Sequence, residues 1–229
     1  FNKRDVIPES YTQDFVEGLS EQGIQLAVVT NHNRFDKDEF QALKAAAEQQ
    51  DIRLMAGVEF SAKDGQRGIH ILIVFDDAWY EGEQDCINAF LTRSFHLKSG
   101  YDKPPYDVNA DFDLCEAVRE LDRFGADYFM VMAHVDHKNG LLEEVKGRNL
   151  EKLVNTSEFK SRVLAFQKST SADKRRECER MMGRRLALVE GSDNADSGME
   201  GIGICNGKDR KCYLKLGAFS NEAVKYALV

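Results

Sequence analysis

The sequence predicts a mostly parallel α/β domain that closes into a barrel. Helical patterns alternate with short apolar runs along the 229 residues, and this alternation is typical of βαβ units. Four of the five histidines lie in or directly after the apolar runs. Parallel α/β proteins carry their functional groups at the carboxyl ends of their strands. A barrel brings groups from non-adjacent strands to one point more readily than an open sheet, so we favour a barrel.

The individual elements follow from apolar periodicity and from boundary residues. Asp36 is a plausible N-cap with Glu39 three residues on, which is the spacing of a capping box. We expect strands at residues 24–30, 52–58, 69–75, 128–133 and 186–189, with an edge strand at 212–216. We expect helices at residues 11–22, 37–50, 85–93, 111–124 and 221–228, and a helical hairpin within 149–183.

Composition narrows the class of protein. At 229 residues the chain fits a single domain over residues 1–229, and its hydrophobic content of 42% is enough for a core. The net charge of −8 argues against a uniformly basic nucleic-acid binder. The five cysteines show no CxxC spacing, and the odd number favours reduced thiols in the cytoplasm. We see no signal peptide and no apolar run of membrane-spanning length, so we expect no membrane contact.

One segment departs from the acidic average. Residues 146–185 contain twelve Lys or Arg and five Asp or Glu, a local charge of +7, which leaves −15 for the rest. We interpret this segment as a basic helical insertion. It would suit a polyanion such as DNA or RNA, and a solvated helical face or a docking surface for another domain explains it equally well.

A metal site is the main functional prediction. Glu59, His70, His134 and Asp193 supply two carboxylates and two imidazoles at or near the ends of strand-like runs, which are the ligands that hydrolytic divalent metals prefer. Glu59 follows an apolar run, where an unpaired charge would cost several kcal/mol. Glu59 or Asp193 could bridge two ions, and His32 is a further ligand candidate.

These residues resemble the motifs of the polymerase-and-histidinol-phosphatase (PHP) domain. The matching segments are Val-Val-Thr-Asn-His-Asn at 28–33, Gly-Val-Glu-Phe-Ser at 57–61, His70 in Gly-Ile-His-Ile-Leu-Ile, Ala-His-Val-Asp at 133–136 and Gly-Ser-Asp at 191–193. The resemblance implies a distorted seven-stranded β/α barrel, up to three divalent ions (manganese, zinc or iron) and hydrolysis of phosphate esters. The form of the motif at 133–136, followed by Lys-Asn-Gly, is most similar to PHP domains fused to AAA- or SMC-like ATPases.

The chain departs from the family pattern at three places. The opening His-x-His motif is absent, and we expect it just upstream of Phe1 in a larger protein. Asn31 stands where the family usually has Asp, and Ala195 stands in place of a late histidine. The resemblance therefore implies one complete metal position (Glu59, His70, His134), one that needs the missing histidines, and one that retains only His32.

We expect a metal-dependent phosphoesterase, and more specifically a nuclease acting on nucleic-acid phosphodiesters through metal-activated water. Asp193 or His137 would move the proton, and Arg34 and Lys138 would hold a phosphate because each closely follows a motif histidine. An ATPase would lie outside this chain, since no Walker-type phosphate loop is present. Two alternatives remain: a degenerate non-catalytic PHP domain that serves as a scaffold or nucleic-acid-binding module, and a small-molecule phosphatase.

Overall fold

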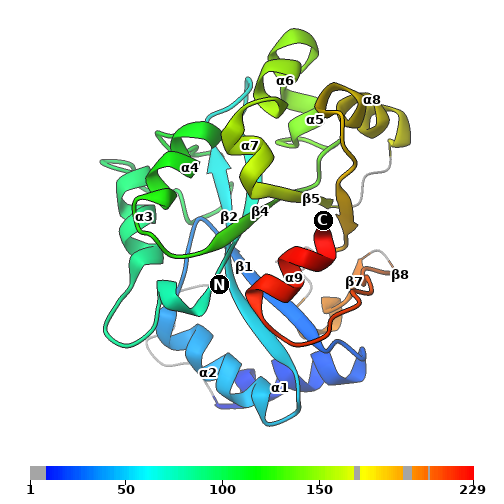
Figure 1. The fold of residues 1–229 in the computed structure, drawn as a ribbon. Helices are drawn as coiled ribbons and strands as arrows, with labels where there is room; N and C mark the ends of the chain where they lie inside the picture. Colours follow the sequence, from blue (N-terminus) through cyan, green and yellow to red (C-terminus); the bar gives the residue numbers. More distant parts are fainter. Residues whose placement is uncertain (1–8, 168–170, 193–197, 206) are drawn as a thin grey trace.

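The computed structural model describes residues 9–167, 171–192, 198–205 and 207–229, and its centre is one six-stranded sheet (Figure 1). The strands follow in the order β1 (Leu26–His32), β2 (Arg53–Ala62), β3 (Ile69–Phe75), β4 (Tyr128–Met132), β5 (Val163–Gln167) and β6 (Ala187–Val189). The sheet is mixed: three of the strand pairs are parallel and two are antiparallel. It curls into a half-barrel, so the described residues do not form the expected closed barrel.

The strand β3 is the antiparallel exception. It pairs antiparallel with both β2 and β4, whereas β1–β2, β4–β5 and β5–β6 are parallel pairs. Only residues 63–68 separate β2 from β3, and a parallel crossover needs a dozen residues or more. A hairpin is the connection that this length allows. It brings the beginning of β3 to the carboxyl end of β2.

Most of the helices cover the convex face of the sheet (Figure 1). The helices are α1 (Glu9–Glu21), α2 (Lys37–Glu48), α3 (Cys86–Ser94), α4 (Leu114–Asp122), α5 (Leu141–Glu144), α6 (Gly147–Val154), α7 (Ser157–Arg162), α8 (Ala172–Met182) and α9 (Asn221–Leu228), with 3₁₀ turns at Asp77–Trp79 and Gly198–Gly201.

The predicted N-cap is confirmed, because the Asp36 side chain accepts the Glu39 amide at 3.1 Å. Alternate strand residues point to opposite faces, and Phe60, Ile71 and Met130 belong to the larger core.

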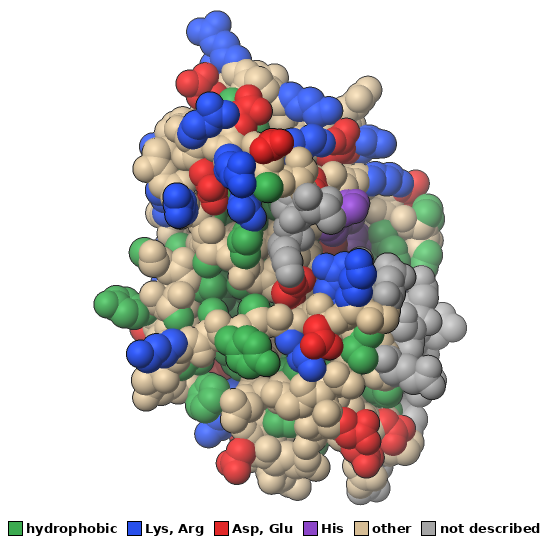
Figure 2. All heavy atoms as spheres, turned by 90° about the vertical axis from the view of Figure 1, so that its right-hand side faces the viewer, with side chains coloured by type: hydrophobic (Ala, Val, Ile, Leu, Met, Phe, Trp, Pro, Cys, Tyr) green, Lys and Arg blue, Asp and Glu red, His purple; other side chains and the backbone are tan. Residues whose placement is uncertain are grey.

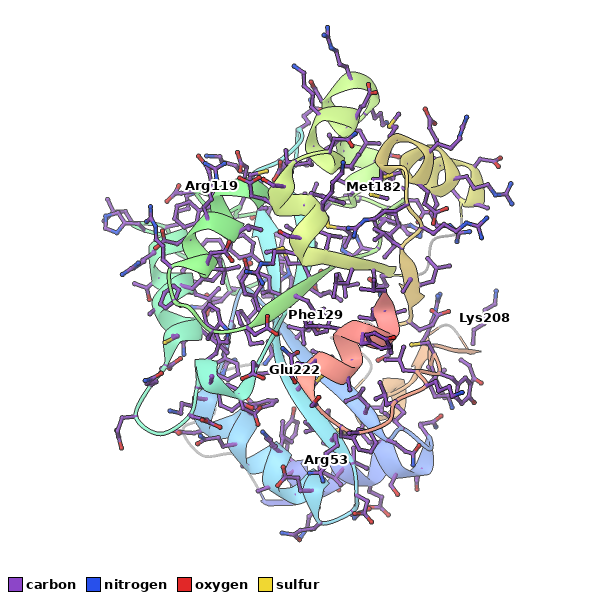
Figure 3. The ribbon with its side chains drawn as sticks, in the orientation of Figure 1. Arg53, Arg119, Phe129, Met182, Lys208 and Glu222 are labelled. Atoms are coloured by element: carbon purple, nitrogen blue, oxygen red, sulfur yellow. The ribbon has the colours of Figure 1, made fainter. Side chains whose placement is uncertain are left out.

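The last helix, α9, packs against the concave face instead. Val224 and Leu228 of α9 join Val74, Phe129 and Val131 in a second apolar cluster. Figure 3 shows Phe129 on β4 beside α9. The opposite end of the strands, where β1, β2 and β4 terminate, is left for polar groups.

Two expectations about elements are wrong. The basic segment 146–185 is not wholly helical, because β5 lies within it and pairs between β4 and β6. Four of the five residues of β5 are buried, so the strand reads as a continuous apolar run, which periodicity cannot distinguish from a buried helix. Residues 212–216 form no strand, although Leu214 and Leu216 pack on the second cluster. A small hairpin, β7 (Ile204–Cys205) with β8 (Lys208–Asp209), precedes them.

None of the helices in the described ranges combines the length and the apolar character that crossing a membrane would require.

The turn after β2 contains a carboxyl group that should make stability depend on pH. Asp64 accepts the backbone N–H of Leu114 at 2.7 Å, and burial raises its pKa from 3.8 to about 6. The folded state therefore binds the proton on Asp64 more tightly than the unfolded state, so the contribution of Asp64 to the free energy of unfolding should fall as the pH rises from about 4 to about 6.

We expect Asp64→Asn to be more stable than the parent by about 2 kcal/mol at pH 7, and equally stable or less stable near pH 4. The Asn carbonyl keeps the bond to Leu114. Urea unfolding of both proteins at pH 4, 5, 6 and 7 measures this difference. A difference that does not change over that range would show that Asp64 titrates normally in the folded protein.

Candidate metal centre

Polar side chains from four consecutive strands lie together at one end of the strands. His32 is the last residue of β1 and is in register with Glu59 of β2. His70 is the second residue of β3 and lies opposite Ser61 of β2. His134 follows β4 by two residues. The antiparallel direction of β3 explains why its histidine stands near the beginning of an apolar run while the other ligand candidates stand near the ends.

Three atoms that could bind a metal ion lie close together at this end of the strands. The Nδ1 atom of His70 lies 2.9 Å from Oε1 of Glu59 and 3.1 Å from Nε2 of His134, and Nε2 of His134 lies 3.3 Å from the same carboxylate oxygen. The other oxygen of Glu59, Oε2, lies 3.8 Å from Nδ1 of His32. Ligand atoms of His32, Glu59 and His70 all lie within 4.8 Å of one another.

The spacing of the three atoms fits a divalent ion. Two ligand atoms at about 2.1 Å from one ion are about 3.0 Å apart at a right angle and about 3.4 Å apart at a tetrahedral angle. The three separations around Glu59, His70 and His134, 2.9 to 3.3 Å, lie within about 0.1 Å of this range. Glu59 also directs its second oxygen toward His32, as a carboxylate that bridges two ions would.

The surroundings of Glu59 and His70 favour the protonation states in which these side chains bind a metal ion. Burial raises the pKa of Glu59, but hydrogen bonds from His134, His32 and His70 outweigh it and hold that pKa well below its ordinary value. Burial lowers the pKa of His70, and the neighbouring Glu59 carboxylate opposes this shift only in part. An ionised carboxylate and a neutral imidazole are the forms that bind metal.

A polar network that the sequence did not predict holds His32. Ser61 Oγ lies 3.0 Å from His32 Nε2, and the buried Asn33 donates to Ser61 Oγ at 3.1 Å and to the Tyr101 carbonyl at 2.9 Å. The ring of Tyr106 lies 4.5 Å from the His32 ring, centroid to centroid. Asn33 has a positive φ of 50°, a conformation that Asn tolerates better than most residues. These contacts fix the imidazole plane from two sides.

His134 is held by a residue that the sequence analysis placed in a helix. The side chain of Gln167, at the end of β5, accepts the His134 backbone N–H at 2.7 Å. His134 has a φ of 25°, which a non-glycine residue adopts only when its surroundings impose it. Gln167 follows an apolar run as the metal ligands do, and this position is the signal by which it could have been found.

The remaining predicted site residues lie at different distances from the candidate metal centre, or outside the described residues. Within the described part of the chain, Arg34 and Lys138 line the cavity that contains Glu59, and Arg34 is also paired with Asp36 at 3.1 Å. His137 does not line that cavity; its side chain is 63% exposed and lies 3.7 Å from Asp136. Asp193 and Ala195 lie outside the described residues.

Comparison with known proteins bears on the fold. No family profile matches the sequence, and no curated protein matches it significantly. A crystal structure from Bifidobacterium adolescentis, provisionally assigned as a metal-dependent phosphoesterase, matches with a TM-score of 0.58 at 13% identity, over 94% of this chain and 89% of that one. An amidohydrolase from Chromobacterium violaceum, with bound sulfate and no metal, matches with a TM-score of 0.50 at 16% identity, over 78% and 80% of the chains.

At these identities the two matches establish a shared fold. The chain has the mixed α/β architecture of these structures, with a curled sheet and a His-Glu-His group placed where it could hold a metal.

Proposed function

We propose that the chain is a PHP-type metal-dependent phosphoesterase that hydrolyses nucleic-acid phosphodiesters. The observation that carries the proposal is the convergence of Glu59, His70 and His134 on one point, with His32 at the second Glu59 oxygen. The likeness in fold to the Bifidobacterium protein supports it, as does the order of the motifs along the chain.

Each residue of the site has a defined part in this proposal. Glu59, His70 and His134 would hold one divalent ion (manganese, zinc or iron), and Glu59, Asp193 and His32 would contribute to further positions. A bound ion of this kind activates water and stabilises charge that develops on phosphoryl oxygens. Arg34 and Lys138 would orient the phosphate from the cavity wall. His137 or Asp193 would transfer the proton.

The charge distribution favours a polyanionic substrate. Figure 2 shows Lys and Arg side chains gathered over the upper part of one face, where α6 and α8 lie, with histidine visible on the same face. Arg148 and Lys152 on α6 and Arg180 on α8 are exposed. Some of the basic charge is neutralised locally, since Lys174 pairs with Glu143 at 2.8 Å. The remaining cations would hold the phosphates that flank the scissile bond.

The test is hydrolysis by the purified chain after chelation and reloading with Mn²⁺ or Zn²⁺. The substrates are single-stranded DNA and RNA oligonucleotides, bis-p-nitrophenyl phosphate as a simple diester and p-nitrophenyl phosphate as a monoester. We expect cleavage of the oligonucleotides and of the diester that requires metal, and a loss of more than 100-fold in His134→Ala. His96→Ala removes an exposed histidine of another segment and should retain full activity.

Two outcomes would replace the proposal. Hydrolysis of the monoester without cleavage of DNA or RNA would identify a small-molecule phosphatase. Oligonucleotide binding without cleavage of any substrate would identify a non-catalytic scaffold or nucleic-acid-binding module, which Asn31 and Ala195 favour because they replace family ligands. In either case the ATPase partner, which we propose lies outside this chain, would have to be sought separately.

A further inference from the structure

A buried carboxylate joins two segments that lead to the candidate metal centre. Glu144 is the last residue of α5, and its side chain is only 2% exposed. Its Oε1 accepts from Arg67 Nη2 at 2.8 Å and Nε at 2.9 Å, and its Oε2 accepts from the Arg67 backbone N–H at 3.2 Å. Oε1 also accepts the backbone N–H of Asn139 at 3.3 Å. One carboxylate therefore joins the β2–β3 turn to the loop after β4.

Both segments lead directly to a predicted metal ligand. Arg67 stands three residues before His70, and the backbone N–H of His70 donates to the Asn139 carbonyl at 2.8 Å. The Asn139 side chain donates back to the Arg67 carbonyl at 2.9 Å. The loop from His134 to Asn139 is tightly wound, since the His137 N–H donates to the His134 carbonyl at 2.9 Å. A displacement of Asn139 would therefore move both histidines.

The backbone of this loop requires such external support. His134 and Asn139 have φ values of 25° and 62°. Asparagine tolerates the left-handed region better than most residues, but a histidine holds such a conformation only when surrounding contacts determine it. The ring nitrogens of His70 and His134, 3.1 Å apart, lie on a turn and a loop that are joined directly by Asn139 and also through Glu144. Metal ligands must be held to within about 0.5 Å to bind well.

We propose that Glu144 is a positioning residue that sets the distance between His70 and His134. It acts through Arg67 and Asn139 and contacts neither the metal nor the substrate. The proposal rests on the metal-dependent function proposed above. Groups hydrogen-bonded directly to metal ligands commonly change metal affinity by about 10-fold to 100-fold when they are replaced, and Glu144 lies one contact further out, so we expect an effect at the lower end of this range.

The test compares Glu144→Gln with Glu120→Gln. Glu120 is a matched control: it is also a buried carboxylate, at 9% side-chain exposure, held by two arginines, Arg93 and Arg123, at 2.5 Å each, and it lies on α4 in the outer layer. Both variants should lose thermal stability. Only Glu144→Gln should lower Zn²⁺ affinity, by about 10-fold, in titration against a fluorescent zinc chelator.

A second readout makes the result independent of metal. The ring ¹⁵N signals of His70 and His134 in the metal-free protein should shift in Glu144→Gln and stay unchanged in Glu120→Gln. Arg67→Met serves if Glu144→Gln fails to fold, because the Arg67 side chain is 52% exposed and its loss removes the main partner of the carboxylate.

The outcomes separate this inference from the proposed function. Ring signals that shift only in the Glu144 or Arg67 variants support the positioning role, even if the parent binds no metal and the phosphoesterase proposal fails. Unchanged ring signals and a Zn²⁺ affinity within twofold of the parent would overturn the positioning role. Equal effects of Glu120→Gln would overturn it too, because they would show that Glu144 contributes only to the general stability of the fold.

Discussion

Replacing Glu59 with glutamine should abolish tight binding of divalent ions. The carboxylate provides the charge at the point where the ring nitrogens of His70 and His134 converge, and its second oxygen faces His32. A neutral amide supplies one weak oxygen ligand and, if turned, presents an N–H group to the ion. We expect the affinity to fall more than 100-fold, which corresponds to roughly 3 kcal/mol.

Mass spectrometry of the metal content after gel filtration measures this directly. The parent should retain at least one Mn, Fe or Zn ion per chain, and Glu59→Gln and His134→Ala should each retain less than about a tenth as much. Glu120→Gln, which removes a buried carboxylate elsewhere, should retain the parent's content. Stoichiometric metal in Glu59→Gln would show that the ion binds somewhere other than the site we describe.

Replacing Gly140 with alanine should cost about 3 kcal/mol of stability and also weaken metal binding. A Cβ atom at this position would lie 2.3 Å from the His134 carbonyl oxygen and 2.6 Å from the Val135 carbonyl carbon. Both neighbours are backbone atoms, which cannot move away by changing rotamer as a flexible side chain can. Gly140 has ordinary extended angles, φ −90° and ψ 147°, so the effect is steric and not conformational.

Urea unfolding of the metal-free protein tests the stability effect, and Gly217→Ala is the control. A Cβ atom at Gly217 would meet no atom within 4 Å, and its substitution should change the unfolding free energy by less than about 0.5 kcal/mol. If Gly140→Ala were equally neutral, the loop after His134 would be looser than the structure describes, and the close approach would not help to place the histidine.

The sequence predicted the alternation of elements well because each signal is local. Apolar runs located β1, β2, β3, β4 and β6 to within a few residues, and the N-cap Asp36 marked the beginning of α2. It failed at β5, which is buried on both faces. It also failed at residues 212–216, where it predicted an edge strand; these residues form no strand, although Leu214 and Leu216 pack on the second apolar cluster.

The site was predicted only in part, because the sequence signals that identify its residues are local. His32, Glu59, His70 and His134 could be identified because each stands at the end or beginning of an apolar run. Ser61, Asn33 and Glu144 could not, because their importance depends on contacts between residues 28 or more positions apart or on a loop conformation. His137, predicted for catalysis, is exposed beside Asp136, and a sequence does not show which way a loop side chain points.

The sequence by itself determined which residue types are available for a metal and at which strand ends they stand, because apolar periodicity and turn chemistry act over a few residues. Only the tertiary structure decided that β3 runs antiparallel, that the sheet remains a half-barrel over the described residues, and that three donor atoms come within 3.3 Å of one another. Those outcomes depend on strand direction and on long-range hydrogen bonds, and these are settled only when distant segments pack together.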